Sequence, residues 1–145
     1  MTKKQEIGKL GEDFACEFLI KKKYKILDRN LRKPWGEIDI IAKAPDKTLV
    51  FIEVKTITEG KINPEEQLTK SKLEKLKKTA SLYAGCHPKL ISDKKGWQID
   101  LIAITIKNSE NLINHYENIT DFWYNKNMAI PPPPEKKISI RTMNS

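Results

Sequence analysis

Residues 36–55 read GEIDIIAKAPDKTLVFIEVK, and the fold can be inferred outward from the two apolar runs in this stretch. The runs span residues 37–43 and 49–55, and both are rich in Ile, Val, Leu and Phe, as β-strands are. Pro45 and Asp46 lie between them, and residues of this kind favour a turn. The stretch therefore predicts two neighbouring antiparallel strands.

The first of these strands carries two acidic residues on one face. Because side chains alternate along a strand, we expect Glu37 and Asp39 on the same face as Ile41, and Ile38 and Ile40 on the other. An isolated buried charge is strongly unfavourable unless it is paired or bound to a metal ion. Acidic residues among large hydrophobic ones therefore indicate a site.

The second strand ends in an acid and a lysine that share a face. Glu53 and Lys55 are expected on the side of Leu49 and Phe51. The opposite face is expected to carry Val50, Ile52 and Val54. Acid-x-Lys triplets occur at three other places in the chain, close to the number expected by chance, so the spacing alone is weak evidence. Only the Glu53 triplet ends an apolar strand beside a second acidic strand.

Two amphipathic helices are expected around these strands. Apolar residues recur at steps of three and four over about residues 5–22, and Glu12 lies beside the small-residue face of that helix. The small residues of that face are Gly8, Gly11 and Ala15. They would allow close approach to another backbone, with Glu12 pointing inward. The second helix has two candidate starts, Asn63 and Thr69.

Three further runs predict strands, at residues 24–29, 97–106 and 112–119. The helix that precedes the strand at 97–106 implies a crossover connection and therefore a parallel neighbour. The order α-β-β-β-α-β predicts one α/β domain over residues 1–124, with a mixed β-sheet flanked by helices. Residues 125–145 contain four consecutive prolines and no periodicity, which predicts a Pro-rich basic tail that is either flexible or the binding segment for a protein partner.

The net charge of +8 over 145 residues favours a polyanionic partner. Its distribution is uneven: +5 over residues 1–33, −2 over 34–60, +4 over 61–100 and +1 over 101–145. An acidic centre between basic flanks suits a metal site that faces a phosphate chain. All but three of the 27 cations are Lys, which favours contacts with the phosphate backbone over readout of base edges. The alternative is a solvated lysine surface.

Other features point to a reduced, cytoplasmic protein. Cys16 and Cys86 lack the spacing of a zinc site, and no apolar run approaches the length of a signal-peptide core or a membrane span. The Cys86-His87 pair is more consistent with a loop than with a nucleophile and its base. Trp97 and the aromatic residues 122–124 are expected to pack in the core or to dock the tail.

The co-facial acids suit phosphodiester hydrolysis. Asp39 and Glu53 would hold Mg²⁺ or Mn²⁺, whose coordination leaves room for water and phosphate. Lys55 would position the attacking water or offset charge in the transition state. The alternative is an ordinary ion pair between strands. Asp100 lies on a different strand and is expected to form structural hydrogen bonds, with a secondary ligand role left open.

Six blocks of the chain, over roughly residues 5–106, occur in the order typical of the YraN family, which this sequence resembles. The blocks are Gly8-x-x-Gly11-Glu12-x-x-Ala15, Arg29-Asn30-Leu31-Arg32, Gly36-Glu37-Ile38-Asp39, Phe51-Ile52-Glu53-Val54-Lys55-Thr56, Thr69-x-x-Lys72 and Gln98-Ile99-Asp100. That family is similar to PD-(D/E)xK restriction-endonuclease-like nucleases, which include archaeal Holliday-junction resolvases. The resemblance implies a restriction-endonuclease-like core.

The resemblance also assigns roles to individual residues. It implies that Asp39 and Glu53 are metal ligands, Lys55 the catalytic lysine, Glu12 an accessory acid and Lys72 a supporting residue on the second helix. We expect the DNA phosphates to be contacted by basic residues of the two flanks. These are Arg29, Arg32, Lys33, Lys70 and Lys72.

The sequence leaves two main functions open. The first is a metal-dependent nuclease that acts on DNA, including branched or repair intermediates. The second is a non-catalytic DNA-binding module of a repair, recombination or uptake complex. Ile57, where the family pattern usually has Arg, the small number of arginines and the Pro-rich tail motivate the second. Leu31, where that pattern usually has Trp, is a further departure from the family. A less favoured third option is association of the Lys-rich first helix with an anionic membrane surface. A homodimer is left open as well.

Overall fold

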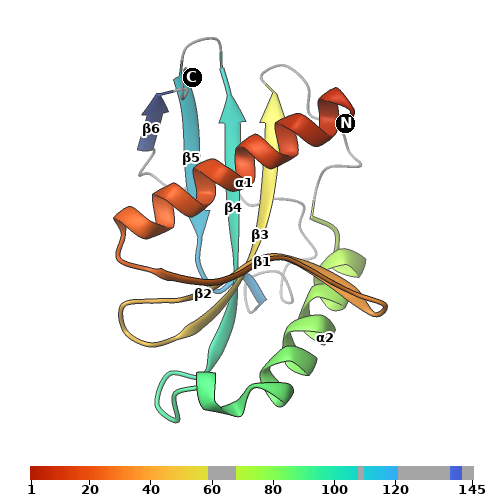
Figure 1. Cartoon of the computed structure of the whole chain (residues 1–145), viewed down its shortest axis with the longest axis vertical. Coiled ribbons are helices and arrows are strands. Elements are labelled where there is room, and N and C mark those ends of the chain that lie inside the picture. Colours follow the sequence, from red (N-terminus) through yellow and green to blue (C-terminus); the bar gives the residue numbers. More distant parts are fainter. Residues whose placement is uncertain (59–67, 108–109, 121–137, 142–145) are drawn as a thin grey trace.

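The computed structural model describes residues 1–58, 68–107, 110–120 and 138–141 of the chain, and in them it shows a six-stranded mixed sheet with two long helices (Figure 1). The elements follow one another as expected, in the order α-β-β-β-α-β, with two further strands. Their bounds are α1 Lys3–Lys21, β1 Lys25–Lys33, β2 Gly36–Lys43, β3 Leu49–Thr58, α2 Lys70–Cys86, the 3₁₀ helix η2 Pro88–Leu90, β4 Trp97–Ile106, β5 Glu110–Tyr116 and β6 Ile138–Arg141. The predicted α/β fold is confirmed.

The sheet runs in sequence order from β1 to β6, and a single pair of neighbours among these described strands is parallel. Strands β1, β2 and β3 form an antiparallel meander. Helix α2 then carries the chain back so that β4 lies parallel to β3, in register from Leu49↔Trp97 to Thr58↔Ile106. Strands β4, β5 and β6 are antiparallel. The crossover predicted from the second helix is therefore confirmed.

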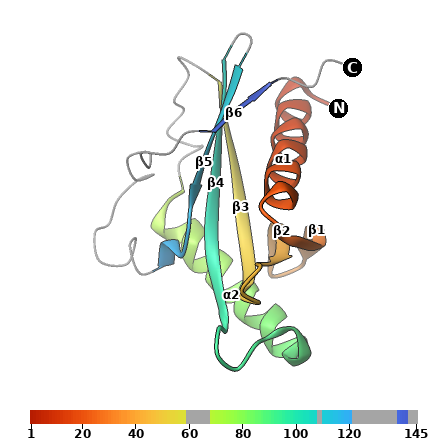
Figure 2. The same cartoon turned by 90° about the vertical axis from the view of Figure 1, so that its left-hand side faces the viewer.

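The two helices cover opposite faces of the sheet (Figure 2). One core cluster joins Phe14 and Leu19 of α1 to the face of β3 that carries Val50 and Ile52. The other joins α2 to the opposite face, where Phe51 is completely buried. The alternation predicted for β3 is thus confirmed on both of its sides.

Local sequence signals fix where the helices begin. The Thr2 side chain accepts a hydrogen bond from the Gln5 amide, and the Gln5 side chain accepts one from the Thr2 amide, which forms a capping box at the start of α1. Thr69 caps α2 by accepting a hydrogen bond from the Lys72 amide at 3.2 Å. Thr69 is therefore the start of α2, and Asn63 lies outside the described residues.

The small-residue face of α1 has one close contact, at Gly11. A Cβ atom added there would lie 2.0 Å from the Thr56 hydroxyl oxygen, whereas one added at Gly8 would meet nothing within 4 Å. Ala15 is completely buried. The prediction of a close helix–strand approach is confirmed at Gly11 and is wrong for Gly8.

The expected position of Ile38 is also wrong. It packs with Ile41 in the cluster beneath α2, whereas Ile40 packs with α1. The pairing between β2 and β3 begins only at Ile40↔Ile52, so the first residues of β2 are free to leave the plane of β3. Gly36 lies against Thr79 of α2, which shows that β2 curls towards this helix.

The last part of the chain differs from expectation in its strands. β5 ends at Tyr116, and residues 119–120 are helical rather than extended. Within the predicted tail, Ile138–Arg141 pairs with β5, while residues 121–137 and 142–145 lie outside the described part. In the described helices, none combines the length and apolar character needed to cross a membrane.

We predict opposite effects of alanine at the two glycines of α1. Both Gly8→Ala and Gly11→Ala gain about 1 kcal/mol of helix propensity, but Gly11→Ala also forces a Cβ atom into Thr56, and such overpacking costs about 1–3 kcal/mol. Urea unfolding should therefore show Gly8→Ala as the more stable of the two variants. Equal stability of the variants would contradict the close contact at Gly11.

Candidate active site

The candidate site lies where β2 and β3 part. Regular pairing of the two strands ends at Ile40↔Ile52. Beyond that pair, the Val54 amide of β3 has no backbone acceptor on β2, and the Asp39 carboxylate accepts its hydrogen bond instead. Its Oδ2 atom accepts a hydrogen bond from the Val54 amide at 2.8 Å. This bond fixes the Asp39 side chain between the strands, beside Glu53.

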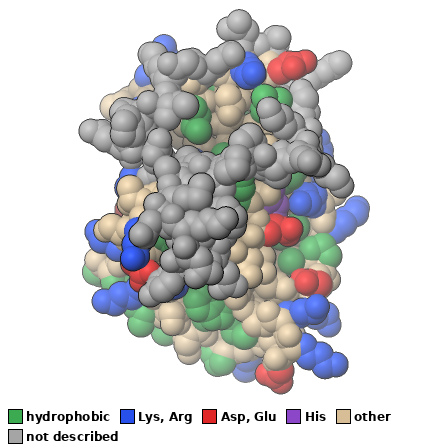
Figure 3. Space-filling model, turned by 180° about the vertical axis from the view of Figure 1, so that it is seen from behind, with side chains coloured by type: hydrophobic (Ala, Val, Ile, Leu, Met, Phe, Trp, Pro, Cys, Tyr) green, Lys and Arg blue, Asp and Glu red, His purple; other side chains and the backbone are tan. Residues whose placement is uncertain are grey.

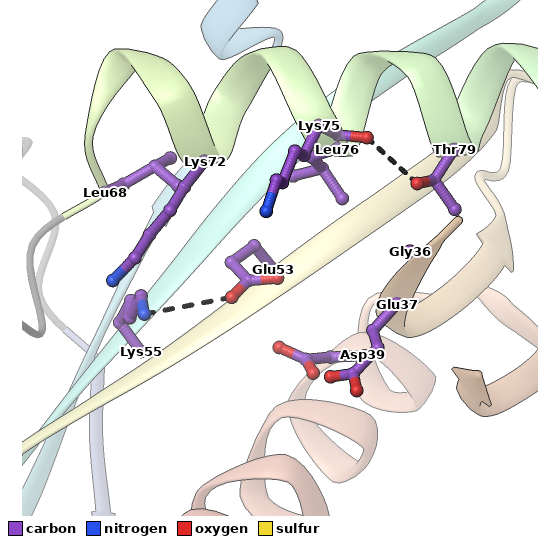
Figure 4. A pocket seen from close by; sticks show the side chains of 10 residues that line it. All are labelled: Gly36, Glu37, Asp39, Glu53, Lys55, Leu68, Lys72, Lys75, Leu76 and Thr79. Carbon is purple, nitrogen blue, oxygen red and sulfur yellow. Dashed lines mark hydrogen bonds and ion pairs between the residues drawn. The ribbon is translucent and has the colours of Figure 1, made fainter. Parts of the chain in front are cut away.

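A pocket of about 350 Å³ opens at this fork (Figure 4). Strand β2 forms one side, β3 the floor and α2 the roof. The lining residues are Gly36, Glu37, Asp39, Glu53, Lys55, Leu68, Lys72, Lys75, Leu76 and Thr79. The structure therefore brings Asp39, Glu53, Lys55 and Lys72 together in one cavity, as the sequence predicted, and adds Lys75 and Thr79.

Glu53 and Lys55 project from the same face of β3 into this pocket. The Lys55 ammonium lies 3.9 Å from Oε1 of Glu53, and the Lys55 and Glu53 side chains are largely buried, at 18% and 23% exposure. At this length the contact is a long ion pair, so each group keeps capacity for another partner. Lys55 therefore lies within reach of any group bound at the Glu53 carboxylate.

Burial raises the pKa values of both acids at the fork, Asp39 and Glu53. Burial, followed by the charge of Asp39, raises the pKa of Glu53 to about 8, although Lys55 and Lys72 oppose this shift. Burial also raises the pKa of Asp39, against the opposing hydrogen bonds from the Val54 amide and Glu53. The fold therefore holds the two carboxyl groups close together in buried surroundings that disfavour their charged forms.

Glu12 reaches the same fork from the other face of the sheet. Its side chain is hydrogen-bonded to Asp39 and to Asn30 of β1, and burial, followed by the charge of Asp39, raises its pKa. The inward position predicted for Glu12 is therefore present, although Glu12 does not line the pocket beneath α2. Glu12 interacts with Asp39, which does line the pocket.

The predicted phosphate contacts lie in different surroundings. Arg29 donates a 2.7 Å hydrogen bond to Asp13 on α1, which ties its guanidinium to the protein. Arg32 and Lys33 are exposed at the end of β1, next to the pocket strand β2. Lys70 begins α2 but does not line the pocket. Of the predicted phosphate-binding residues, all of which are described, Lys72 alone does so.

Lys75 is the charged residue of the pocket that the sequence did not single out. It follows Lys72 by three residues and precedes the buried Leu76, so it lies at the edge of the helix face that covers β3. The hydroxyl of Thr79 donates to the Lys75 carbonyl at 2.9 Å, one turn further along. The three-four spacing of Lys72, Lys75, Leu76 and Thr79 is the signal that identifies this face.

Basic side chains are not confined to the pocket. Figure 3 shows the molecule from behind the view of Figure 1. On the described part of this surface, Lys and Arg side chains lie along both margins, with fewer acidic side chains among them. Of the acids in residues 34–60, Glu37, Asp39 and Glu53 line the pocket at the fork.

A second polar cluster lies on the α1 face of the sheet. Among the described residues, Asp100, His115 and Glu117 form one group whose potential ligand atoms lie within 4.8 Å of one another. Such spacing could hold a metal ion. Asp100 itself is completely buried and accepts hydrogen bonds from Gln98 at 2.8 Å and from the Asn118 amide at 2.9 Å.

The hydrogen bonds of His115 favour a structural role for this second cluster. The Lys22 ammonium can only donate, so Nδ1 of His115, 3.2 Å away, accepts, and Nε2 carries the proton. Nε2 then donates to Asp100 at 2.7 Å. Both polar atoms of the imidazole are thereby used inside the protein. Asp100 has the structural hydrogen bonds expected of it and faces away from Glu53.

The donor set at the fork fits a hard divalent cation. Carboxylate oxygens are the ligands that Mg²⁺ and Mn²⁺ prefer, and Asp39 and Glu53 are in contact with each other. A cation held by both would relieve the repulsion that raises the pKa of Glu53, and the pocket leaves space for further ligands.

We predict that Glu53→Gln stabilises the metal-free protein at high pH. In the folded state Glu53 has a pKa of about 8 instead of 4.5, so wild-type stability falls as pH rises through this interval. The variant carries a neutral amide at this position and lacks this loss. In urea unfolding with a chelator, the variant should gain on the order of 1–4 kcal/mol relative to wild type between about pH 5 and pH 9. A constant difference would contradict the raised pKa.

Comparison with known proteins places this site within a family. The model of the uncharacterised protein family UPF0102 matches residues 11–104, a range that includes the whole fork. A UPF0102 protein of Syntrophomonas wolfei is 36% identical over 115 residues, which cover 79% of this chain and 96% of that protein. One of Thermotoga neapolitana is 41% identical over 110 residues, 75% of this chain and 92% of that protein. One of Campylobacter jejuni subsp. jejuni is 48% identical over 115 residues, 78% and 92% respectively. The resemblance to the YraN family is thereby confirmed, and the chain belongs to the UPF0102 family.

Proposed function

We propose that the protein is a metal-dependent nuclease that hydrolyses phosphodiester bonds in DNA. The observation that carries the proposal is the convergence of Asp39, Glu53 and Lys55 in one pocket beneath basic residues of α2. Two adjacent carboxylates with a neighbouring lysine form a hard-cation site next to a group that can stabilise negative charge. The resemblance of the sequence to PD-(D/E)xK nucleases supports the same reaction class.

Each residue at the fork has a distinct role in the proposed reaction. Asp39 and Glu53 would hold the cation, which, when bound, polarises the phosphate and lowers the pKa of water. Lys55 lies 3.9 Å from Glu53 and offsets negative charge that develops on the phosphate. Glu12, hydrogen-bonded to Asp39, keeps that carboxyl oriented from the α1 side.

The lysines of α2 suit the binding of the substrate backbone. Lys72 and Lys75 line the roof of the pocket, opposite the carboxylates. An ammonium group interacts with a phosphate as a point charge and does not contact the base, so binding through these lysines is independent of the DNA sequence. Affinity should therefore fall steeply as salt concentration rises.

We predict that Glu53→Gln abolishes cleavage of DNA while leaving most of the binding. The substitution removes a metal ligand but none of the lysines that contact phosphate, so chemistry and binding separate. The measurement is cleavage of plasmid, branched and single-stranded DNA with Mg²⁺ or Mn²⁺, beside binding in a chelator. Glu74→Gln is the control and should cut as wild type does, because Glu74 lies on α2 outside the pocket, 3.9 Å from Lys77. Cleavage of DNA by the Glu53→Gln variant at the wild-type rate would contradict the proposal.

A non-catalytic DNA-binding module is the second candidate. Two features favour it: the residue after the Lys55-Thr56 pair is Ile57, where the family resemblance implies Arg, and the Arg29 guanidinium is paired with Asp13 at 2.7 Å. Both reduce the guanidinium groups available for phosphate at this site. Such a module would bind DNA without tight binding of a cation at the fork.

Calorimetric titration with Mn²⁺ distinguishes the two candidates. If the fork is a metal site, wild type binds Mn²⁺ and Asp39→Asn does not. The affinity then rises with pH and levels off above about pH 8, because Glu53 must lose its proton to bind the metal. The released proton should make the enthalpy depend on the buffer. DNA binding without Mn²⁺ binding, at any pH in this range, would favour the non-catalytic module.

A further inference from the structure

One aromatic side chain stands exposed at the edge of the proposed site. Trp35 is 50% exposed, whereas Trp97 packs its ring edge-on against Phe51 at 5.5 Å between ring centroids. A single exposed hydrophobic residue is common on protein surfaces and is no evidence of a site by itself. The position of Trp35 relative to the pocket is what distinguishes it.

Trp35 sits at the tip of the hairpin that joins β1 to β2, one residue before a wall of the pocket. Its neighbour Gly36 lines the pocket, and consecutive Cα atoms are about 3.8 Å apart. Gly36 also lies against Thr79 of α2, so closely that an added Cβ atom would be 2.0 Å from the Thr79 hydroxyl oxygen. The hairpin tip is therefore packed on α2, and Trp35 is held next to the pocket rather than on a free loop.

Cations occur on both elements that meet at this position, the β1–β2 hairpin and α2. Arg32 and Lys33 precede Trp35 at the exposed end of β1, and Lys72 and Lys75 line the pocket on α2. An aromatic ring beside a track of cations is the arrangement with which proteins bind single-stranded nucleic acid, because bases stack on the ring while cations hold the phosphates. In an intact duplex the faces of the bases are covered by their neighbours, so the ring would find no base to stack on.

We propose that Trp35 stacks on an unpaired base of the DNA strand whose phosphates enter the pocket. The preferred substrate class is then DNA with unpaired bases next to the cleaved bond, as in single strands, flaps and branch points. The substrate side of this inference rests on the proposed nuclease function, but the stacking contact does not require cleavage. Trp35 acts here as a specificity-determining residue.

The test measures binding in a chelator, so that no cutting occurs. Fluorescence anisotropy compares a labelled single strand, a duplex of the same sequence and a duplex with a single-stranded flap. Loss of base–aromatic stacking of about 1–3 kcal/mol predicts that Trp35→Ala weakens binding to the single strand and the flap about 5- to 150-fold. Trp35→Tyr, which keeps an aromatic ring, should retain most of the affinity, and duplex binding should change less than about twofold.

Leu82→Ala is the matched control, because Leu82 is another exposed hydrophobic residue, 43% exposed on α2 and outside the pocket. It should bind all three DNAs as wild type does. Wild-type affinity of Trp35→Ala for the single strand, or an equal loss on duplex and single strand, would overturn the inference even if the protein cuts DNA. A selective loss in a protein that never cuts would uphold the stacking contact and reject the nuclease proposal. No binding of any of the three DNAs by wild type would overturn both.

Discussion

The hydrogen bond from the Val54 amide to the Asp39 carboxylate is the contact on which the arrangement of the site depends. It occupies the place where the next backbone pair of β2 and β3 would lie, so the two strands separate without leaving the amide unpaired. The separation opens the pocket, and the same bond holds Asp39 against Glu53. One carboxylate thus ends a strand pairing and forms half of an acidic pair.

The fork is electrostatically costly in the absence of a bound cation. Burial raises the pKa values of Glu12, Asp39 and Glu53, and the charge of Asp39 raises those of the other two further. A structure selected for stability alone gains nothing from three buried acids, two of which have pKa values raised further by the charge of the third. Their gathering at a pocket roofed by Lys72 and Lys75 is understandable if a cation and a phosphate enter together.

The rest of the fold supplies rigid walls to this fork. α1 approaches β3 closely at Gly11, which brings Glu12 within hydrogen-bonding distance of Asp39. α2 packs Leu73 and Leu76 on the opposite face, and its contact with Gly36 fixes the hairpin that ends in Trp35. The parallel pairing of β3 with β4 places the Asp100 network on the α1 face, away from Glu53. The two polar clusters are therefore separate.

Alternation along a regularly paired strand is what made Glu53 and Lys55 predictable from the sequence. The same reasoning failed for Ile38, because β2 is no longer paired with β3 there and stays paired only with β1, so its faces are not held in line with those of β3. Helix periodicity predicts that Leu73, Leu76 and Ala80 form the buried face of α2, and they do, but it does not single out Lys75, because a count of apolar residues does not register a lysine at the edge of that face. The partners of Asp100 depend on the register between β4 and β5, which no local pattern specifies.

Anomalous diffraction from a crystal soaked in Mn²⁺ would show whether a cation binds at the fork. We expect a manganese peak bonded to carboxylate oxygens of both Asp39 and Glu53, and its loss in the Asp39→Asn variant. A peak at Asp100, His115 and Glu117 with none at the fork would contradict the assignment of Asp39 and Glu53 as metal ligands, because among the described residues these three form a group spaced closely enough to hold an ion.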